Sequence, residues 1–195
     1  MSFFIFSTLK VYEIVGLQCI NPSFSGGEFR ISNAVNAWEK LKLHLPEFLR
    51  YELLRAIPRD VLESGKGRGV DEGIISKLSR ADNLLALRVR RNSYPIFVED
   101  EDKMQFRYMR YWIESGHQKA GVQISPLLSI AMDFLDQELD KGCIFEQNMQ
   151  RGDMGFTNNV LVAHARNSFK SDPTGETPPR HKVRAWIQVQ NKQSY

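Results

Sequence analysis

The last quarter of the chain, residues 143–190, contains four short segments rich in apolar and β-branched residues. They read CIFEQNM, GDMGFTNN, VLVAHARNSF and RHKVRAWIQVQ, and turn-forming residues separate them. Segments of this length and composition are typical of β-strands. A further segment near the N-terminus, VYEIVGLQCI, reads as a buried strand that ends at the turn signal NPSFSGG. Strands at both ends with helical stretches between them predict an α+β, β-dominated domain closed by its C-terminal strands.

Helical periodicity occurs in two internal stretches, at about residues 33–80 and 125–141. In the first, apolar residues recur every three or four positions from Val35 to Leu45, and Pro46 divides the stretch into two helices. Ser32 or Asn33 is expected to cap the first helix, because a short polar side chain can accept a hydrogen bond from an unpaired N–H of the first turn.

The stretch at 125–141, SPLLSIAMDFLDQELDKG, has the clearest helical pattern in the chain. Ser125 is the expected N-cap, Pro126 occupies the first helical position, and Gly142 ends the helix. Leucines and an alanine form one apolar stripe, and acidic residues lie on the opposite face.

Two stretches in the middle alternate well enough to predict strands: NLLALRVRRN (83–92) and MQFRYMRYWI (104–113). Pro95 and the acidic run EDED (99–102) mark the connection between them. The basic residues of RVRRN are read as a solvated strand face. The loop ESGKGRGVDEG (63–73) lacks G-x-x-x-x-G-K-[ST], so a phosphate-binding loop is not supported.

Composition is that of one packed domain over residues 1–195, with 42% hydrophobic and 25% charged residues. A net charge of +3 is too small to indicate a nucleic-acid partner. The apolar N-terminus is interrupted by Lys10 and Glu13, so it predicts core strands rather than a signal peptide or a membrane span. Cys19 and Cys143 have no C-x-x-C spacing, which predicts reduced thiols and a cytoplasmic location.

His164 stands in an apolar run, and an imidazole buried there needs a hydrogen-bond partner or a metal ion. Arg180, Lys182 and Arg184 are separated by two residues each, so their side chains project from one face if the stretch is a strand. An imidazole beside two guanidiniums suits an anionic small molecule next to a metal.

A purely structural role for the same residues is the commoner situation. A buried histidine is often satisfied by a backbone carbonyl, and Arg180 and Arg184 could pair with Asp172 and Glu176 of the acidic loop KSDPTGETPP. Periodicity alone does not distinguish the two interpretations.

The stretch GDMGFTNNVLVAHARNSF…PPRHKVRAWIQV resembles the C-terminal signature of the TauD/TfdA (taurine dioxygenase-like) family of Fe(II)/2-oxoglutarate-dependent oxygenases. That signature is roughly G-D-x-x-F-x-N-N-x-x-x-x-H-x-R-x-x-F, followed by R-H-x-x-R-x-W. Upstream, GLQCINPSFSGGE resembles the family's strand and Gly-Gly-acid loop, and the resemblance extends over nearly the whole chain. The matching residues of the signature are Gly152, Asp153, Phe156, Asn158, Asn159, His164, Arg166, Phe169, Arg180, His181, Arg184 and Trp186.

The resemblance implies a double-stranded β-helix (jelly roll, clavaminate synthase-like) with helical insertions and without its first strands. It implies Fe(II) and 2-oxoglutarate as cofactors, and hydroxylation of a small, anionic or amino-acid-like substrate. By the same resemblance His164 is the catalytic iron ligand, Arg180 and Asn159 bind 2-oxoglutarate, and Arg184 reaches the anionic group of the substrate.

The chain departs from the family pattern at the other iron ligands. The family's H-x-[DE] motif is absent from all 195 residues, since none of His44, His117 and His181 has an acid two positions later. His117 is expected on the surface in an SGHQ turn. Phe29 occupies the position after Gly-Gly-acid where the family commonly has Thr or Ser, and it donates no hydrogen bond.

Three explanations of these departures remain open at this stage: a truncated family member, a degenerate relative, or a chain that takes ligands from a partner. Truncation would expose a sheet edge and favour a homo-oligomer. The competing hypothesis to an enzyme is a catalytically inactive domain that keeps an anion site around Arg180 and Arg184.

Overall fold

The computed structural model describes residues 13–60, 81–100 and 103–188. The chain divides into two compact units, one made of the segments up to Asn36 and from Leu139 onward, the other of Ala37–Glu138. The first unit contains the two three-stranded sheets and every residue of the predicted site, and the second contains most of the helical residues.

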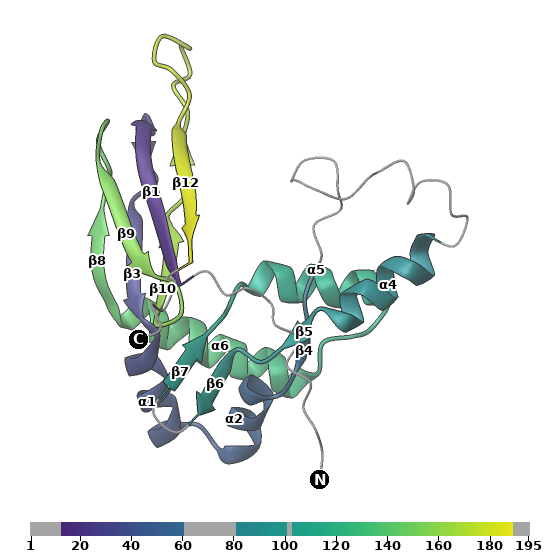
Figure 1. Ribbon diagram of the computed structural model, residues 1–195. Helices are drawn as coiled ribbons and strands as arrows, with labels where there is room; N and C mark the ends of the chain where they lie inside the picture. The colour runs from purple at the N-terminus through teal and green to yellow at the C-terminus, as the bar shows by residue number, and fades with distance from the viewer. Residues whose placement is uncertain (1–12, 61–80, 101–102, 189–195) are drawn as a thin grey trace, which may run out of the picture. The chain divides into compact units, whose positions relative to one another are not determined.

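The first unit contains two antiparallel sheets of three strands each, whose strands lie side by side in Figure 1. Both sheets join strands from opposite ends of the sequence, as the pattern of strands predicted. A short pair, β2 (Ser25–Gly26) with β11 (Phe169–Lys170), adds to them. In order, the first sheet consists of β12 (His181–Ile187), β1 (Ile14–Asn21) and β9 (Met154–Asn158), and the second of β10 (Val162–Arg166), β3 (Phe29–Asn33) and β8 (Cys143–Gln147).

The two sheets pack together through alternate residues of their central strands. Cys19 from β1, Phe29 from β3 and Met149 form a buried cluster, with Leu17 and Ile31 packed against it. Because side chains two apart on a strand share a face, the sides that carry these residues are called the inner faces of the two sheets.

The second unit is built from helices and two short hairpins around its own aromatic core. Trp38 stacks on Phe97 with ring centroids 4.6 Å apart, and Phe97 lies 5.1 Å from Phe106. The elements are most of α1 (Ala34–His44), α2 (Glu47–Leu54), β4 (Ile57–Pro58), α4 (Ala81–Arg91), β5 (Ser93–Tyr94), β6 (Phe97–Asp100), β7 (Lys103–Phe106), α5 (Arg110–Ala120) and most of α6 (Pro126–Lys141). None of the helices in the described segments is long and apolar enough to cross a bilayer.

The predicted helix starts are confirmed. Asn33, rather than Ser32, caps α1, because its Oδ1 accepts a hydrogen bond of 3.0 Å from the N–H of Asn36. Ser125 caps α6 in the same way, with its Oγ 3.0 Å from the N–H of Leu128. Pro46 separates α1 from α2, as expected.

The prediction of strands in the middle of the chain is wrong for residues 83–92, which belong to α4. The R-V-R-R pattern resembles the alternation of a strand, because Val89 is completely buried and its basic neighbours are more exposed. A helix that packs on α5 with Val89 facing inward gives the same pattern of burial. Residues 104–113 are divided between β7 and α5. The predicted loop at 63–73 lies outside the described residues.

The prediction that His117 lies in a surface turn is also wrong. His117 is 4% exposed within α5, and its Nδ1–H donates to the carbonyl of Ile113 at 2.7 Å. Gly116 lies within the helix. A glycine is needed there because the helix passes directly over the backbone of Arg59 and Asp60, and a Cβ would come within 2.6 Å of it. The Ser-Gly pair therefore marks close packing and not a turn.

Candidate functional site

Strand register places His164 and Arg184 on the two inner faces. His164 pairs with Ile31 across β10 and β3, and Arg184 pairs with Leu17 across β12 and β1. Residues directly opposite each other in antiparallel strands point to the same side of a sheet. Since Ile31 and Leu17 both pack against the buried cluster, the imidazole and the guanidinium are directed into the space between the sheets.

The pKa of the His164 imidazole is lowered from its ordinary value of 6.5, chiefly by burial and further by the positive charge of Arg184. The second cause agrees with the strand register, which places both side chains on the inner faces. A lowered pKa keeps His164 neutral near pH 7, so that one ring nitrogen retains a lone pair for a metal ion or a hydrogen bond.

We expect the pKa of His164, measured by NMR from its ring proton, to lie below 6.5 and to rise when Arg184 is replaced by glutamine. The rise should be partial, because burial is the larger cause and remains in the variant. As the pH falls below 6.5, the unfolded chain takes up this proton before the folded chain does. The free energy of unfolding therefore decreases as the pH falls from 6.5 to the lowered pKa of His164, and it stays decreased at lower pH. An unchanged pKa in R184Q, with R151Q as the charge control, would contradict the proximity.

Arg180 lies one residue before β12 and is half-buried. Its Nε is covered and has no hydrogen-bond partner among the described residues. Burial lowers the pKa of this guanidinium, and the nearby charge of Arg166 lowers it further. A buried donor without an acceptor costs about 1–3 kcal/mol, so Arg180 is held in a position that favours an anionic ligand.

No carboxylate among the described residues forms an ion pair with Arg166, Arg180 or Arg184. By contrast, Arg30 on the opposite face of β3 contacts both Asp140 and Glu146, at 2.9 and 3.2 Å. The positive charge on the inner faces is therefore uncompensated by nearby described acids.

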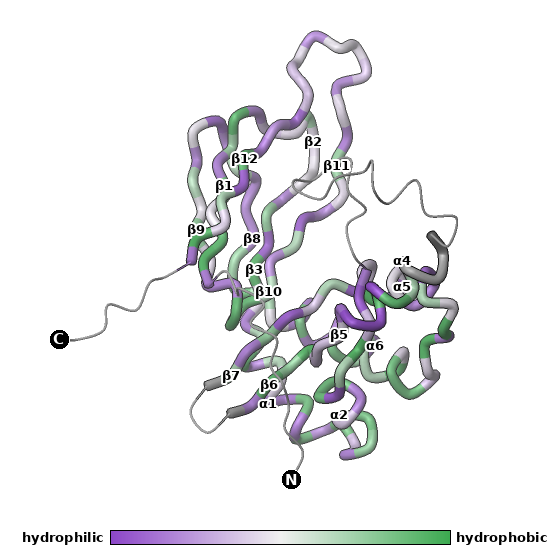
Figure 2. Tube along the Cα trace, turned by 45° about the vertical axis from the view of Figure 1, so that its right-hand side comes forward, coloured by the Kyte–Doolittle hydropathy of each residue, from purple (hydrophilic) through white to green (hydrophobic). Residues whose placement is uncertain are grey.

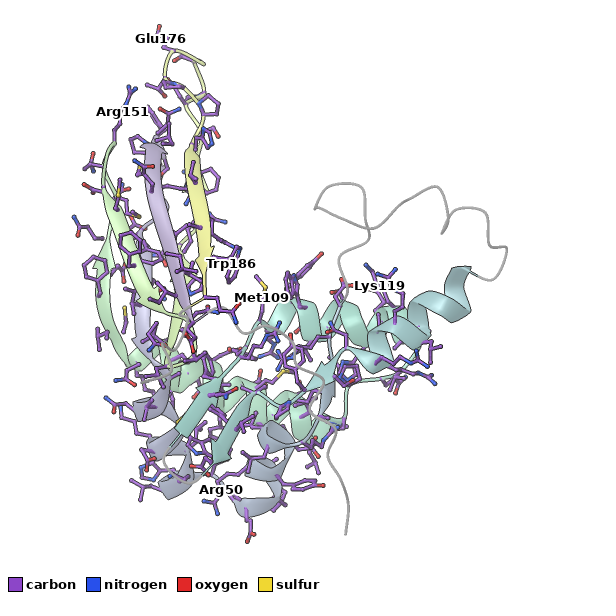
Figure 3. All side chains as sticks on the ribbon, in the orientation of Figure 1. Arg50, Met109, Lys119, Arg151, Glu176 and Trp186 are labelled. Carbon is purple, nitrogen blue, oxygen red and sulfur yellow. The ribbon has the colours of Figure 1, made fainter. Side chains whose placement is uncertain are left out.

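The acidic loop before β12 does not neutralise these arginines. The carboxylate of Asp172 accepts hydrogen bonds from Thr174 and Thr177 within the loop, and these bonds lower its pKa to about 2. The loop is hydrophilic and extends beyond the strands (Figure 2). Figure 3 shows Glu176 at its tip, at the end remote from Trp186. The interpretation that Arg180 pairs with this loop is not supported.

Phe169, at the start of β11, connects two of the guanidiniums. The Cζ of Arg166 lies 4.5 Å from the centre of its ring, and the Cζ of Arg180 lies 5.3 Å from it. In the sequence, Arg166 and Phe169 stand out only as matches to the family signature. The H-x-R spacing was the available signal, because it places Arg166 on the same strand face as His164.

The Gly-Gly pair determines where Phe169 lies. Gly26 pairs with Phe169 across β2 and β11, and the N–H of Gly27 donates to the carbonyl of Ser168 at 2.9 Å. Both glycines have positive φ, 67° and 82°. A Cβ on Gly26 would come within 2.5 Å of the Ser168 carbonyl oxygen, and one on Gly27 within 3.1 Å of the Phe169 Cβ.

The remaining predicted ligand, Asn159, lies elsewhere. Its backbone N–H donates to the carbonyl of Glu13 at the start of β1, whereas Arg180 is near Cys19 at the other end of that strand. The structure therefore does not bring Asn159 to Arg180, and its assignment stays a prediction. Lys182, opposite Cys19, donates to the carbonyl of Met149 at 3.3 Å.

Both cysteines have free thiols. Cys19 is completely buried in the core cluster, and its Sγ donates to the carbonyl of Met149 at 3.3 Å. Cys143 is only partly buried, in β8. Neither thiol serves as a ligand in the described geometry.

The described residues do not fit a complete iron site. They contain no group of three or more His, Cys, Asp and Glu side chains that could hold a metal ion. His164 is a single imidazole, and a metal ion held by one protein ligand is bound weakly. The covered Nε of Arg180, which has no described acceptor, suits a carboxylate group.

Two antiparallel sheets that pack together and join strands from both ends of the sequence are the arrangement expected of a jelly roll. The model of the taurine catabolism dioxygenase TauD, TfdA family matches residues 8–186. The chain belongs to this family, whose cofactors are Fe(II) and 2-oxoglutarate.

Among curated proteins the chain is similar to FR-33289 synthase from Streptomyces rubellomurinus (strain ATCC 31215). The two are 22% identical over 186 residues, which are 94% of this chain and 49% of the relative. The chain thus spans about half the length of that relative.

Solved structures with the same fold include two oxygenases. One is asparagine oxygenase in complex with Fe(II), 2S,3S-3-hydroxyasparagine and succinate, with a TM-score of 0.59 and 13% identity over 92% of this chain and 46% of that one. The other is the non-heme iron oxygenase OrfP with Fe, succinate and (3R,4R)-dihydroxy-L-Arg, with a TM-score of 0.55 and 14% identity over 92% and 48%. These likenesses confirm the predicted jelly-roll class of fold.

Proposed function

We propose that this chain forms the 2-oxoglutarate-binding part of an Fe(II)/2-oxoglutarate-dependent oxygenase that hydroxylates a small, anionic or amino-acid-like substrate. The observation that carries the proposal is the uncompensated positive charge on the inner faces. Arg184 lies there with the neutral imidazole of His164. Arg180 lies just before β12, within electrostatic reach of Cys19 and Arg166, and no described carboxylate forms an ion pair with either guanidinium.

Each residue has a separate role in this proposal. Arg180 binds the distal carboxylate of 2-oxoglutarate through paired N–H donors, including the Nε that has no acceptor in the protein. Arg184, which is exposed and close to His164, binds the anionic group of the substrate. His164 supplies one nitrogen ligand for Fe(II), and the metal when bound would supply the oxygen chemistry.

The amino-acid-like substrate class is supported by the names of the structural relatives, which act on asparagine or are complexed with arginine derivatives. An amino acid carries a carboxylate, which a guanidinium recognises through two parallel hydrogen bonds. Arg184 is suitably placed for that contact because its charge reaches the imidazole, and its guanidinium lies 5.5 Å from the centre of the Trp186 ring.

A second candidate function is a non-catalytic domain that binds an anion around Arg180 and Arg184. It is favoured by one observation, namely that no group of metal ligands occurs in the described residues. In this case the same guanidiniums would bind a dicarboxylate without any reaction.

We expect the chain to bind 2-oxoglutarate in the absence of Fe(II), as measured by isothermal titration calorimetry. Adding Fe(II) under anaerobic conditions separates the two functions: a visible charge-transfer band supports the oxygenase, and 2-oxoglutarate binding without the band supports the anion-binding domain. A chain that binds no 2-oxoglutarate under either condition contradicts both.

A further inference from the structure

Arg166 and Arg180 share one aromatic neighbour, Phe169. The Cζ atoms of the two guanidiniums lie 4.5 and 5.3 Å from the centre of its ring. The charge of Arg166 disfavours the charge of Arg180, and no described carboxylate forms an ion pair with either guanidinium. The face of the Phe169 ring attracts both cations and offsets part of this repulsion.

Each member is fixed from a different part of the sequence. Arg166 ends β10 opposite Phe29, and its Nη1 donates to the carbonyl of Asn167 at 3.0 Å. Phe169 is paired with Gly26 in β2. Arg180 approaches from the start of β12, and its pKa responds to Arg166 and to Cys19.

We propose that Phe169 is a positioning residue that holds Arg166 and Arg180 together as a two-guanidinium site for one carboxylate group. This inference rests on the proposed function, since the carboxylate is the distal one of 2-oxoglutarate. Phe169 acts through the arginines and touches no reacting atom. Arg166 supplies a second positive charge beside Arg180, which increases the attraction for an anion.

The geometry is consistent with a ligand that extends from this site toward His164. His164 and Arg166 are two residues apart on β10, which separates their Cα atoms by about 7 Å. Both side chains lie on the inner face. A short dicarboxylate bound at Arg166 and Arg180 therefore points its other end along the strand toward the imidazole.

The test compares 2-oxoglutarate with 2-oxopentanoate, which has the same 2-oxo acid group but a methyl in place of the distal carboxylate. Phe169→Leu removes the aromatic face and keeps an apolar side chain. In the wild type, 2-oxopentanoate should bind more weakly than 2-oxoglutarate, because it offers no carboxylate to the arginines. We expect Phe169→Leu to weaken 2-oxoglutarate binding about three- to thirtyfold and to leave this weaker binding of 2-oxopentanoate unchanged. Phe169→Tyr keeps the aromatic ring face and should bind 2-oxoglutarate with the affinity of the wild type.

Arg166→Ala should weaken 2-oxoglutarate binding about tenfold, again without effect on 2-oxopentanoate. Arg151→Ala, at an exposed turn of the same unit, is the matched control for loss of one positive charge, and no change is expected (Figure 3). Equal loss for the two ligands in F169L would indicate a general packing defect and would overturn the positioning role.

A second measurement is independent of ligand affinity. In the ligand-free protein the ring current of Phe169 should shift the Nε–H and Cδ protons of Arg180, and Phe169→Leu should remove that shift. If these resonances are the same in F169L and wild type, Phe169 does not position Arg180, even if 2-oxoglutarate binds. If the shift is lost as expected but the wild type binds no 2-oxoglutarate, the positioning role of Phe169 stands and the proposed function fails.

Discussion

Replacing Arg180 by alanine is expected to abolish 2-oxoglutarate binding without destabilising the fold. Truncating one partner of a desolvated charge pair costs about 2–5 kcal/mol of binding free energy, which is a loss of about 30-fold or more in affinity. The free energy of unfolding should change little. Arg180 has a covered Nε without an acceptor and no described ion pair, and the loss of its contact with the Phe169 ring is offset by relief of the repulsion from Arg166. Calorimetric titration and urea unfolding measure the two quantities.

Arg30→Ala is the matched control for this prediction. Arg30 lies on the opposite face of β3, where it contacts Asp140 and Glu146. We therefore expect the reverse result, a lower free energy of unfolding with unchanged affinity for 2-oxoglutarate. Unchanged affinity in R180A would refute the assignment of Arg180, and a clear loss of stability would show that its role is structural.

Gly26→Ala is expected to have the largest effect on stability among the substitutions considered. The new Cβ would be 2.5 Å from the carbonyl oxygen of Ser168, and the φ of 67° disfavours any side chain. The backbone conformation costs about 1–2 kcal/mol and the steric overlap about 1–3 kcal/mol. Urea unfolding should therefore show a loss of about 2–5 kcal/mol, and 2-oxoglutarate affinity should fall because Phe169 is displaced.

Gly175→Ala separates the two contributions. Gly175 has a similar φ of 74°, but no atom lies within 4 Å of its would-be Cβ. Its substitution should cost only the conformational part, about 1–2 kcal/mol, and leave ligand binding unchanged. Equal losses in G26A and G175A would contradict the view that the Gly-Gly pair exists to let Phe169 and Ser168 pack closely.

Local signals in the sequence predicted several elements correctly. Asn33 and Ser125 cap helices because a polar side chain precedes an apolar periodic stretch, and Pro46 divides two helices because it has no N–H to donate. The C-terminal strands were predicted because each is short and bounded by turns. These features depend on residues that are close in sequence, so the amino-acid sequence alone is enough to predict them.

The errors come from contacts between distant residues. Residues 83–92 alternate like a strand, but Val89 is buried because α4 packs on α5. Gly116 looks like a turn residue, but a glycine is needed there because a side chain would overlap the backbone of Arg59 and Asp60. Neither partner can be identified from local sequence.

The site was predicted in part, for the same physical reason. Even spacing on a strand indicated that Arg184 and Lys182 share a face, and the register agrees. The contacts of Phe169 with Arg166 and Arg180 depend on three strands meeting, and spacing alone does not indicate them.

The central claim is that the imidazole of His164 and the guanidinium of Arg180 face one ligand site between the two sheets. The most direct test is an NMR titration with 2-oxoglutarate that follows the ring proton of His164 and the Nε–H of Arg180 in the same samples. The account predicts that in the wild type both resonances shift with a single Kd. In R180A the ring proton of His164 should no longer shift with 2-oxoglutarate. In the wild type titrated with 2-oxopentanoate, the Nε–H of Arg180 should not shift. A shift at Arg180 with no response at His164 up to saturation would contradict it.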